Sequence, residues 1–428
     1  MTVFESWLAD VQRHGVKMGL ERVRAALEIL DSPQRRVPSL LVAGTNGKGS
    51  TVTFASALLG AAGHRVGSTC SPHLIDYRER FRFDGRLITP EQLEEVGTAL
   101  HDALASRPEL AELTFFELGT LIAARWFADE GADAAVLEVG MGGEFDASRA
   151  AEPRVVVLTN VDLDHQGFLG DSVEEIAATK ARAVPPGGIL VSTEVRPDRL
   201  PAIEAAAQDA GARHLLADRD FVWSFDEGLN FELGAFRMDS VALGMPGAHQ
   251  GGNAAAALAG TLAFCEATGL AAPDPWQAAG ALGRAKLSGR FDRVRTGPGR
   301  PVVVLDGAHN PAGAQALAQA LLLRGRPPQR TWLFACMKDK DRGPLIDALL
   351  PHVDRVVCAR GTSSDRFAAP EQLAEEVRER GGEALAGGTV AEALQELLRR
   401  GGSRDEVLVA GSLYAVGDAR RSLGLEPA

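Results

Sequence analysis

Runs of apolar residues alternate with stretches of helical period along most of the chain. In the first half, these runs predict buried strands at residues 39–43, 134–139, 154–158 and 188–191. Strands separated by helices pair in parallel, because the helix returns the chain to the same end of the sheet. The pattern therefore predicts an α/β fold with a parallel sheet in the N-terminal part.

The pattern changes between residues 221 and 245, where short alternating segments are separated by Asp226-Glu-Gly and Leu233-Gly. Turn residues between alternating runs are typical of hairpins, so we expect antiparallel strands appended to the sheet. An alanine-rich helical run follows at residues 253–262.

A change of composition at residues 287–300 marks the expected domain boundary, since this segment carries three glycines, one proline and four arginines. Strand and helical patterns alternate beyond it, with strands at 301–305, 331–335, 355–359 and 406–410 and helices near 312–323, 370–380 and 390–399. The alternation predicts a smaller, doubly wound domain of Rossmann-like type. We expect residues 1–289 to form the first domain and residues 290–428 the second.

The length of 428 residues exceeds the size at which a single hydrophobic core stops growing, which supports two domains. The formal net charge of -12 argues against nucleic acid or an anionic membrane surface as a partner. No apolar stretch is long enough to span a bilayer, and the N-terminal residues lack the features of a secretory signal. The four cysteines are far apart and predict no disulfide framework, so we expect a cytoplasmic protein. The sequence has no obvious apolar interaction segment, so we expect a monomer.

The strongest local signal is the glycine-rich segment after the first strand, Gly44-Thr-Asn-Gly-Lys-Gly-Ser-Thr51. Glycines let backbone N–H groups approach phosphate oxygens, and the following helix adds partial positive charge at its N-terminus. Lys48 is placed to reach the terminal phosphates, and the hydroxyl of Ser50 or Thr51 to hold Mg²⁺. Gly49 interrupts the general spacing GxxxxGKS/T, so an ordinary strand-to-helix turn is the alternative.

Two further strands end in carboxylates. Glu138 ends the second strand, and Asp162, Asp164 and His165 follow the third. Carboxylate oxygens with one imidazole suit Mg²⁺ or Mn²⁺ better than structural zinc. The alternatives are that a neighbouring arginine pairs with Glu138 and that His165 is an ordinary surface or core residue.

A parallel sheet brings these three strand ends to one edge. Together, a phosphate loop, an acidic strand end and an Asp/His turn indicate metal-assisted phosphoryl transfer. In the second domain, Asp306 and His309 follow a strand in the same way and are expected to face a ligand crevice. The alternative there is that Asn310 only caps the next helix and that His309 is solvated.

Five blocks of sequence resemble the folylpolyglutamate and dihydrofolate synthases of the Mur ligase superfamily. In the order of that family, they are residues 44–50, Ser71-Pro-His-Leu74, and residues 137–143, 159–165 and 306–311. The likeness covers nearly the whole chain and includes the additional Gly49. It implies an α/β fold in which a P-loop-containing parallel-sheet ATPase domain with appended antiparallel strands is followed by a smaller Rossmann-like glutamate-ligase domain.

The resemblance implies an ATP-dependent ligase that adds L-glutamate to a folate-type carboxylate through an acyl phosphate. Its acceptors would be tetrahydrofolate and dihydropteroate. Two other functions remain open. One is a Mur-type ligase that acts on a UDP-linked cell-wall precursor, and the other is a nucleotide-dependent switch that forms no ligation product.

The resemblance also implies two magnesium sites. Ser50, Ser71 and Glu138 would hold one Mg²⁺, and Glu138, His165 and Lys180 would hold the second. Lys180 would be carbamylated by CO₂, which turns an ammonium group into a carboxylate ligand. From the helical pattern alone, Lys180 would be an ordinary exposed residue.

The remaining assignments also come from the family. ATP would be bound by Thr45, Asn46, Gly47, Lys48, Gly49, Ser50, Thr51, Asn253, Arg290, Asp306 and His309. The catalytic residues would be Lys48, Lys180 and His309, and the folate and glutamate substrates would contact Phe115, Phe116, Asp146 and Ser412. The chain departs from the family pattern near these sites, at Glu144, Arg149, Thr179 and Arg182.

Overall fold

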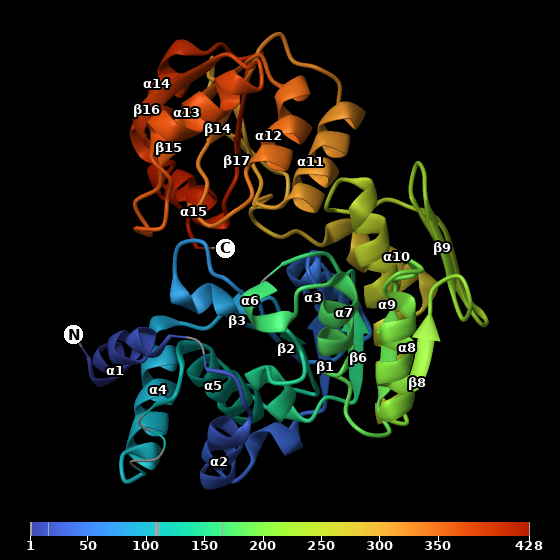
Figure 1. Ribbon diagram of the computed structural model, residues 1–428. Helices are drawn as coiled ribbons and strands as arrows, with labels where there is room; N and C mark the ends of the chain where they lie inside the picture. The colour runs from blue at the N-terminus through green and yellow to red at the C-terminus, as the bar shows by residue number, and fades with distance from the viewer. Residues whose placement is uncertain (1, 16, 108–109, 111, 165, 428) are drawn as a thin grey trace. The chain divides into compact units, whose positions relative to one another are not determined.

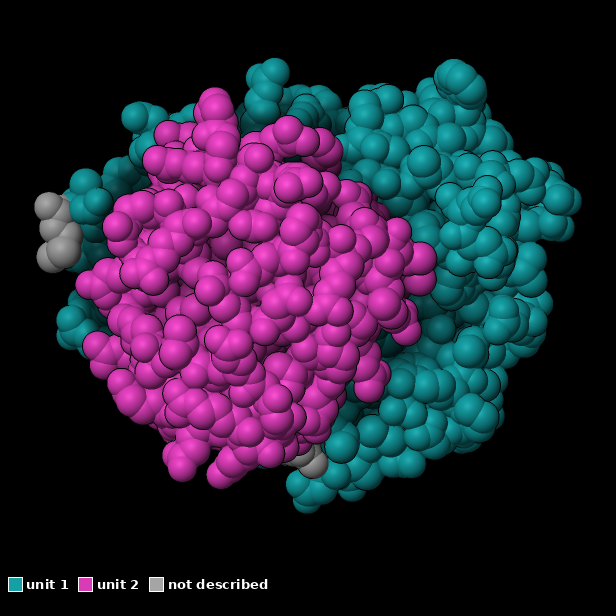
Figure 2. Space-filling model, turned by 90° about the horizontal axis from the view of Figure 1, so that it is seen from above, with its two compact units in different colours: residues 1–71, 80–244, 250–285 teal, residues 72–79, 245–249, 286–428 magenta. Residues whose placement is uncertain are grey.

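Figure 1 shows the computed structural model, which describes residues 2–15, 17–107, 110, 112–164 and 166–427. The chain forms two compact units, coloured separately in Figure 2. Unit 1 comprises residues 1–71, 80–244 and 250–285, and unit 2 comprises residues 72–79, 245–249 and 286–428. The predicted domain boundary between residues 289 and 290 stays a prediction. Each unit is described by itself below.

Unit 1 is built on an eight-stranded sheet in the order β4-β3-β2-β5-β1-β6-β7-β8. The strands are β1 (Ser39–Ala43), β2 (Val66–Thr69), β3 (Phe81–Phe83), β4 (Arg86–Leu87), β5 (Ala134–Glu138), β6 (Val155–Leu158), β7 (Ile189–Ser192) and β8 (Arg213–Leu216). From β2 to β8 every pair is parallel, whereas β3 and β4 are antiparallel additions at one edge. The predicted parallel sheet is therefore confirmed.

The helices around this sheet are α1 (Val3–Val11), α2 (Glu21–Ile29), α3 (Lys48–Ala61), α4 (Pro90–Leu104), α5 (Phe115–Asp129), α6 (Gln166–Leu169), α7 (Val173–Ala181), α8 (Leu200–Asp209), α9 (Ala248–Thr268) and α10 (Pro275–Arg284). Short 3-10 turns occur in unit 1 at Gln12–His14, Pro33–Arg36 and Ala147–Ala151, and a further one at Tyr77–Arg80 lies mostly in unit 2. Among the described helices, none has the length and apolar character needed to cross a membrane.

Helix α9 lies very close to the sheet because its inner face is made of alanine and glycine. A Cβ atom at Gly260 would lie 2.4 Å from Cγ2 of Val157 in β6. Small side chains let the helix backbone approach the strand, so α9 carries its own polar residues close to the end of β1.

The predicted hairpin segment forms a three-stranded antiparallel sheet, in the order β11-β10-β9. Its strands are β9 (Val222–Phe225), β10 (Leu229–Leu233) and β11 (Phe236–Val241). This sheet is separate from the large sheet, which corrects the expectation that these strands extend it.

Unit 2 contains a six-stranded sheet in the order β12-β13-β17-β14-β15-β16, in which only β12 is antiparallel. Its strands are β12 (Asp292–Arg295), β13 (Val302–Leu305), β14 (Arg330–Phe334), β15 (Arg355–Arg360), β16 (Ala384–Thr389) and β17 (Glu406–Ala410). Its helices are α11 (Pro311–Leu323), α12 (Gly343–Leu349), α13 (Pro370–Glu379), α14 (Val390–Arg400) and α15 (Leu413–Ser422), with a 3-10 turn at Leu350–His352.

Alternate residues of β14 belong to different cores in unit 2. Trp332 and Phe334 lie in one cluster of buried side chains, whereas Leu333 lies in another. A strand that is buried on both faces belongs to a sheet with helices on both sides. Unit 2 is therefore doubly wound, as predicted.

Replacing Leu408 tests the importance of this packing, because the side chain is 0% exposed in β17. We expect Leu408→Ala to lower the free energy of unfolding by about 3 kcal/mol, since a buried leucine leaves a cavity. The matched control is Leu322→Ala on α11, where the leucine is 65% exposed, and its change should be within about 0.5 kcal/mol. Urea denaturation followed by circular dichroism measures both, and equal losses would contradict the core assignment.

Candidate functional site

The glycine-rich loop between β1 and α3 has a backbone that only glycine can adopt at two positions. Gly44 and Gly47 have φ angles of 144° and 82°. A Cβ atom would lie 2.0 Å from Thr159 Oγ1 at Gly44 and 2.1 Å from Asn253 Oδ1 at Gly47. Both contacts are far inside van der Waals distance, so the loop is tightly enclosed and leads directly into the N-terminus of α3.

Ser50, in the first turn of α3, carries a buried hydroxyl that suits a metal ion. Its side chain is 1% exposed, and its Oγ atom has no hydrogen-bond partner among the described residues. A buried hydroxyl without a partner is costly, and coordination to Mg²⁺ removes that cost. Thr51 is different, because its Oγ1 atom donates to the carbonyl of Asn253 at 3.4 Å.

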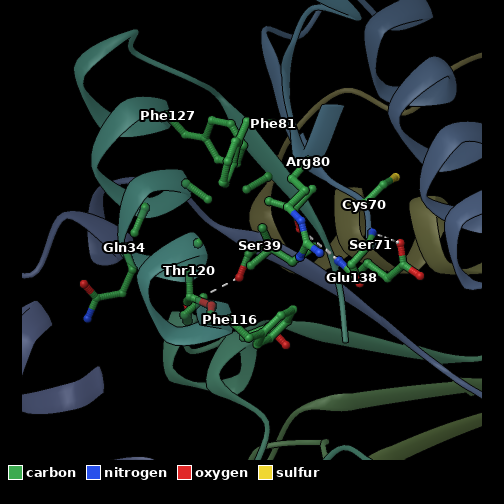
Figure 3. Close-up of a pocket in the computed structure, with 18 of the residues that line it drawn as sticks. Gln34, Ser39, Cys70, Ser71, Arg80, Phe81, Phe116, Thr120, Phe127 and Glu138 are labelled. Carbon is green, nitrogen blue, oxygen red and sulfur yellow. Dashed lines mark hydrogen bonds between the residues drawn. The ribbon is translucent and has the colours of Figure 1, made fainter. Parts of the chain in front are cut away.

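Ser71 and Glu138 meet at the neighbouring strand end. Glu138 is the last residue of β5, which pairs with β1, and it is 5% exposed. Its Oε2 atom accepts a hydrogen bond from the backbone N–H of Ser71 at 2.8 Å (Figure 3). The three predicted ligands of the first metal therefore come from adjoining elements of unit 1, with one carboxylate and two hydroxyls.

Asp162 lies among arginines after the end of β6. The Oδ1 atom of Asp162 lies 2.8 Å from Arg196 and 3.5 Å from Arg199, so arginines hold this carboxylate in place of the predicted metal. Within the described ranges, no three His, Cys, Asp or Glu side chains form a metal-binding group. His165, predicted as a ligand of the second metal, lies outside the described residues.

Lys180 is buried in α7, which corrects the expectation of an exposed residue. It is 3% exposed, and its Nζ atom donates to the carbonyl of Gly44 at 3.1 Å. Lys48 donates to the same carbonyl at 3.0 Å. Burial, and then the nearby Lys48 ammonium, lower the pKa of Lys180 to about 7, although the carboxylates of Asp164 and Asp146 raise it. A substantial fraction of this amine is therefore uncharged at neutral pH.

Asp146 is fully enclosed near this lysine. Burial raises the pKa of Asp146, although hydrogen bonds from Ser148 and from backbone N–H groups oppose the rise. The N–H of Met141 donates to it at 2.9 Å, and the Ser148 hydroxyl donates as well. Phe116 packs on the adjoining turn, since a Cβ atom at Gly140 would lie 2.6 Å from its ring.

Three of the departures from the family pattern lie side by side. Arg182 NH1 is 3.8 Å from Glu144 Oε2, and the N–H of Glu144 donates to the carbonyl of Thr179 at 3.2 Å. This ion pair therefore connects Glu144, in the turn before Asp146, to Arg182 at the end of α7. Arg149 turns elsewhere, and its Nε atom donates to the carbonyl of Ala183 at 3.2 Å.

A cavity of about 50 Å³ lies between α5 and strands β1, β2 and β5 of unit 1. Figure 3 shows Ser71 and Glu138 on one side of this cavity and Gln34 on the other. Its walls are mostly apolar and include Phe81, Phe116 and Phe127. Phe115 is not one of the lining residues, but its ring lies 4.9 Å from the guanidinium carbon of Arg80, which does line the cavity.

In unit 2, Arg290, Asp306 and His309 gather at the end of β13. Burial raises the pKa of Asp306, although the Arg290 guanidinium opposes this shift. The carboxylate accepts hydrogen bonds from the N–H groups of Phe291 and Ala308, both at 2.8 Å. The Nδ1 atom of His309 lies 2.8 Å from the carbonyl oxygen of Gly307.

Two helix caps in unit 2 carry polar side chains of interest. Asn310 caps α11, because its Oδ1 atom accepts from the N–H of Gly313 at 2.8 Å. Ser412, predicted to lie near the incoming glutamate, is buried at the N-cap of α15 and accepts from the N–H of Tyr414 at 3.2 Å. Asn253 belongs to unit 1, where its side chain packs on Gly47.

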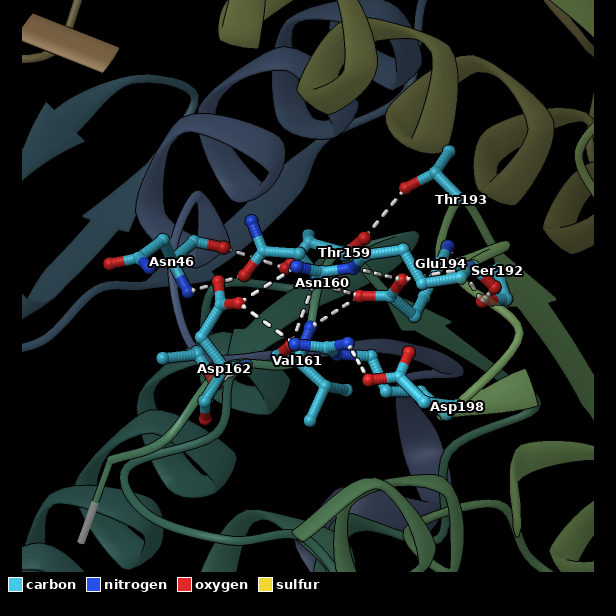
Figure 4. Close-up of polar contacts among 12 residues, drawn as sticks. Asn46, Thr159, Asn160, Val161, Asp162, Ser192, Thr193, Glu194 and Asp198 are labelled. Atoms are coloured by element: carbon cyan, nitrogen blue, oxygen red, sulfur yellow. Dashed lines mark hydrogen bonds and ion pairs between the residues drawn. The ribbon is translucent and has the colours of Figure 1, made fainter. Parts of the chain in front are cut away.

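The turn at residues 159–162 holds the glycine-rich loop (Figure 4), whereas the sequence pattern indicated only a metal-binding role for its Asp162. Thr45 Oγ1 donates to the carbonyl of Asp162 at 3.1 Å and accepts from its N–H at 3.0 Å. The N–H of Asn46 donates to Asn160 Oδ1 at 2.9 Å, and Thr159 Oγ1 donates to the carbonyl of Asn46 at 2.7 Å. The available signal was a run of polar residues directly after a buried strand.

Comparisons with known proteins match both parts of the chain. The model of the Mur ligase middle domain matches residues 42–261, and that of the Mur ligase glutamate ligase domain matches residues 289–413. The folylpolyglutamate synthase/dihydrofolate synthase of Yersinia pestis, solved with AMPPNP and a Mn ion, has a TM-score of 0.85 at 31% identity and covers 99% of this chain and 98% of its own. The chain belongs to the folylpolyglutamate synthase/dihydrofolate synthase family of Mur ligases.

Two other relatives extend this comparison. Escherichia coli FolC, solved in complex with DHPP and ADP, has a TM-score of 0.87 at 29% identity and covers 98% of this Mur ligase and 97% of its own chain. A probable bifunctional folylpolyglutamate synthase/dihydropteroate synthase of Haloferax volcanii is 37% identical over 97% of this chain. The chain spans about half the length of that protein, 49%.

The buried Lys180 gives this Mur ligase a pH-dependent stability. The unfolded lysine has a pKa of 10.5 and the folded one a pKa of about 7. Between these values the unfolded chain binds more protons, so the free energy of unfolding rises with pH through this window and is lowest below it. We expect Lys180→Met to remove the rise and to be more stable than the wild type at neutral pH.

Thermal denaturation in buffer free of metal and CO₂ checks this prediction. The control is Lys286→Met, in which an exposed lysine is replaced and the rise should persist. If all three proteins gained stability equally with pH, Lys180 would not be the group responsible.

Proposed function

We propose that the chain is an ATP-dependent ligase that adds L-glutamate to tetrahydrofolate and to dihydropteroate through an acyl phosphate. The observation that carries the proposal is the enclosed glycine-rich loop, which leads to a buried Ser50 hydroxyl without a protein partner. A phosphate group and its metal ion are the ligands that this combination fits. The location that suits this chemistry is the cytoplasm, and all four cysteines are unbridged.

Binding of ATP would begin at the N-terminus of α3. Backbone N–H groups there attract phosphate oxygens, and Lys48 would exchange its contacts with Gly44 and Thr45 for the terminal phosphates. Asn253 would contact the base. From unit 2, Arg290, Asp306 and His309 would contribute to the same nucleotide.

The metal ligands fit magnesium by their chemistry. One ion would be held by Ser50, Ser71 and Glu138, and a second by Glu138, His165 and carbamylated Lys180. Two magnesium ions in these places would neutralise charge on the phosphates. An ammonium at Lys180 would repel this ion, whereas a carbamate would attract it. The lowered pKa of Lys180 favours that reaction, because only an uncharged amine attacks CO₂.

The chemistry then follows from activating a poor electrophile. The carboxylate of the folate attacks the γ-phosphorus of ATP and displaces ADP, which forms an acyl phosphate. The amine of glutamate attacks the acyl carbon, and phosphate leaves as the amide forms. Lys48 and Arg290 would stabilise the charge that develops during transfer, His309 would position the γ-phosphate, and Ser412 would contact glutamate.

The acceptor would bind on the side of Asp146. This carboxyl is buried and has a raised pKa, so it would read hydrogen-bonding groups at the edge of a pterin ring. Phe116, together with Phe115, would supply apolar contact for the ring. We propose that the enzyme acts as a monomer.

An assay of ATP turnover tests this function. We expect phosphate release with Mg²⁺ only when L-glutamate and a folate acceptor are both present, with products that are one glutamate heavier by mass spectrometry. Lys48→Met should reduce the rate by a factor of about a hundred or more, because it removes a cation from the transferred phosphate. The control Lys286→Met should keep full activity.

Other outcomes of the same assay separate the alternatives. Turnover of a UDP-linked cell-wall precursor without turnover of folates would assign a different Mur ligase activity. Hydrolysis that needs no glutamate and gives no amide would indicate a nucleotide-dependent switch.

Carbamylation of Lys180 has its own test. We expect the protein in carbon-13 bicarbonate to show a carbamate resonance by NMR, because the lowered pKa of Lys180 leaves part of the buried amine uncharged near neutral pH. Lys180→Arg should lose this resonance, whereas Lys286→Arg should keep it. An identical spectrum for the wild type and Lys180→Arg would refute the modification.

A further inference from the structure

The turn after β6 supports the glycine-rich loop, but it has no regular structure of its own. Residues 159–162 leave the sheet at the end of β6 and contact the loop through both side chains and backbone. A turn without helix or sheet pairing needs other partners to keep one conformation. The groups that hold it come from the end of the next strand, β7 (Figure 4).

Glu194 is the first of these groups. It follows β7, which pairs with β6, and it is only 3% exposed. Its Oε2 atom accepts a hydrogen bond from the N–H of Val161 at 2.8 Å. Beside it, Thr193 Oγ1 donates to the carbonyl of Thr159 at 2.7 Å. The segment after β7 therefore holds the turn at Thr159 and at Val161.

Arg196 joins three parts of this arrangement with one guanidinium group. Its Nε atom donates to Glu194 Oε1 at 2.7 Å, and its NH1 atom donates to Asp162 Oδ1 at 2.8 Å. Its NH2 atom donates to the carbonyl of Val161 at 2.7 Å. Arg199 adds a further bond to this carbonyl at 2.8 Å. The planar guanidinium thus fixes the directions of the carboxylate, the aspartate and the backbone at the same time.

We propose that Glu194 and Arg196 are positioning residues for the phosphate loop, which act through Val161 and Asp162 on Thr45 and Asn46. The proposal rests on ATP binding at the loop, as put forward above. The buried carboxylate of Glu194 requires a cation, and Arg196 is the cation that also fixes the turn. Any shift of this pair displaces Asp162, whose backbone makes two reciprocal hydrogen bonds to the Thr45 hydroxyl.

The first test compares two identical substitutions. Arg196→Lys keeps the charge but lacks the planar guanidinium whose three nitrogens reach the three acceptors, so we expect ADP to bind about tenfold more weakly in calorimetric titrations. The matched control is Arg342→Lys in unit 2. Arg342 also pairs with a carboxylate through two bonds, to Glu376 at 2.8 and 2.6 Å, and donates to the carbonyl of Lys338 at 3.0 Å. This control should change ADP affinity by less than about twofold.

A milder variant covers the case in which Arg196→Lys does not fold. Asp162→Asn weakens the contact with Arg196 and leaves both the buried Glu194 pair and the backbone bonds to Thr45 in place. We expect it to weaken ADP binding by about threefold.

A double-mutant cycle then shows whether the effect passes through the loop. Thr45→Val removes the hydroxyl that Asp162 holds, so adding Arg196→Lys to it should weaken ADP binding by only about threefold. A merely structural role for Arg196 would give the same factor with and without the Thr45 hydroxyl. Full additivity would therefore overturn the proposal.

Hydrogen exchange of the ligand-free protein separates this inference from the proposed function. We expect the amides of Thr45 and Asn46 to exchange faster in Arg196→Lys and at the wild-type rate in Arg342→Lys. Faster exchange supports positioning even if the wild type binds no ADP, a result that would count against ATP binding alone. Unchanged exchange at both amides would overturn the proposal.

Discussion

The hydrogen bonds between the glycine-rich loop and the turn after β6 are the constraint on which the nucleotide half of the molecule depends. A loop that presents its N–H groups to a ligand cannot use them to stabilise itself, so other segments must supply its partners. Thr45 and Asn46 find these partners at Asp162 and Asn160. The first N–H groups of a helix have no partner within the helix, so those at the start of α3 suit an anion, while these contacts hold the loop that leads to them.

The order of the strands makes this contact a consequence of the sheet. Strand β1 lies between β5 and β6, and all three are parallel, so their last residues emerge at one edge. The glycine-rich loop after β1 therefore has Glu138 of β5 on one side and the turn at residues 159–162 on the other. The alanine-rich face of α9 completes the enclosure, because its close approach to β6 presses Asn253 against Gly47. The sheet and α9 therefore fix the position of the glycine-rich loop and of the residues beside it.

The central strands could be predicted because they are buried on both faces and appear as continuous apolar runs. Strand β16 could not, since Gly387 and Gly388 interrupt it and it is half exposed. The chemistry at strand ends was visible wherever a carboxylate followed an apolar run. The pairing of Asp162 with Arg196 could not be predicted, because Arg196 is 34 residues away in the sequence and could have paired with any acidic residue near β6. Burial of Lys180 did leave a signal, since it lies four residues after the buried Ile176 on the same face of α7.

The electrostatics of the site bear on how the proposed phosphate site fits a chain of net charge -12. Lys48 and Lys180 donate to the same carbonyl, and each ammonium group raises the cost of the other. The repulsion between Lys48 and Lys180 is relieved differently at each lysine. Phosphate oxygens would pair with Lys48, whereas Lys180 avoids charge by remaining partly neutral near pH 7. The proposed carbamate also requires an uncharged amine at this position. The burial of Lys180 thus lowers its pKa and at the same time favours the proposed reaction with CO₂.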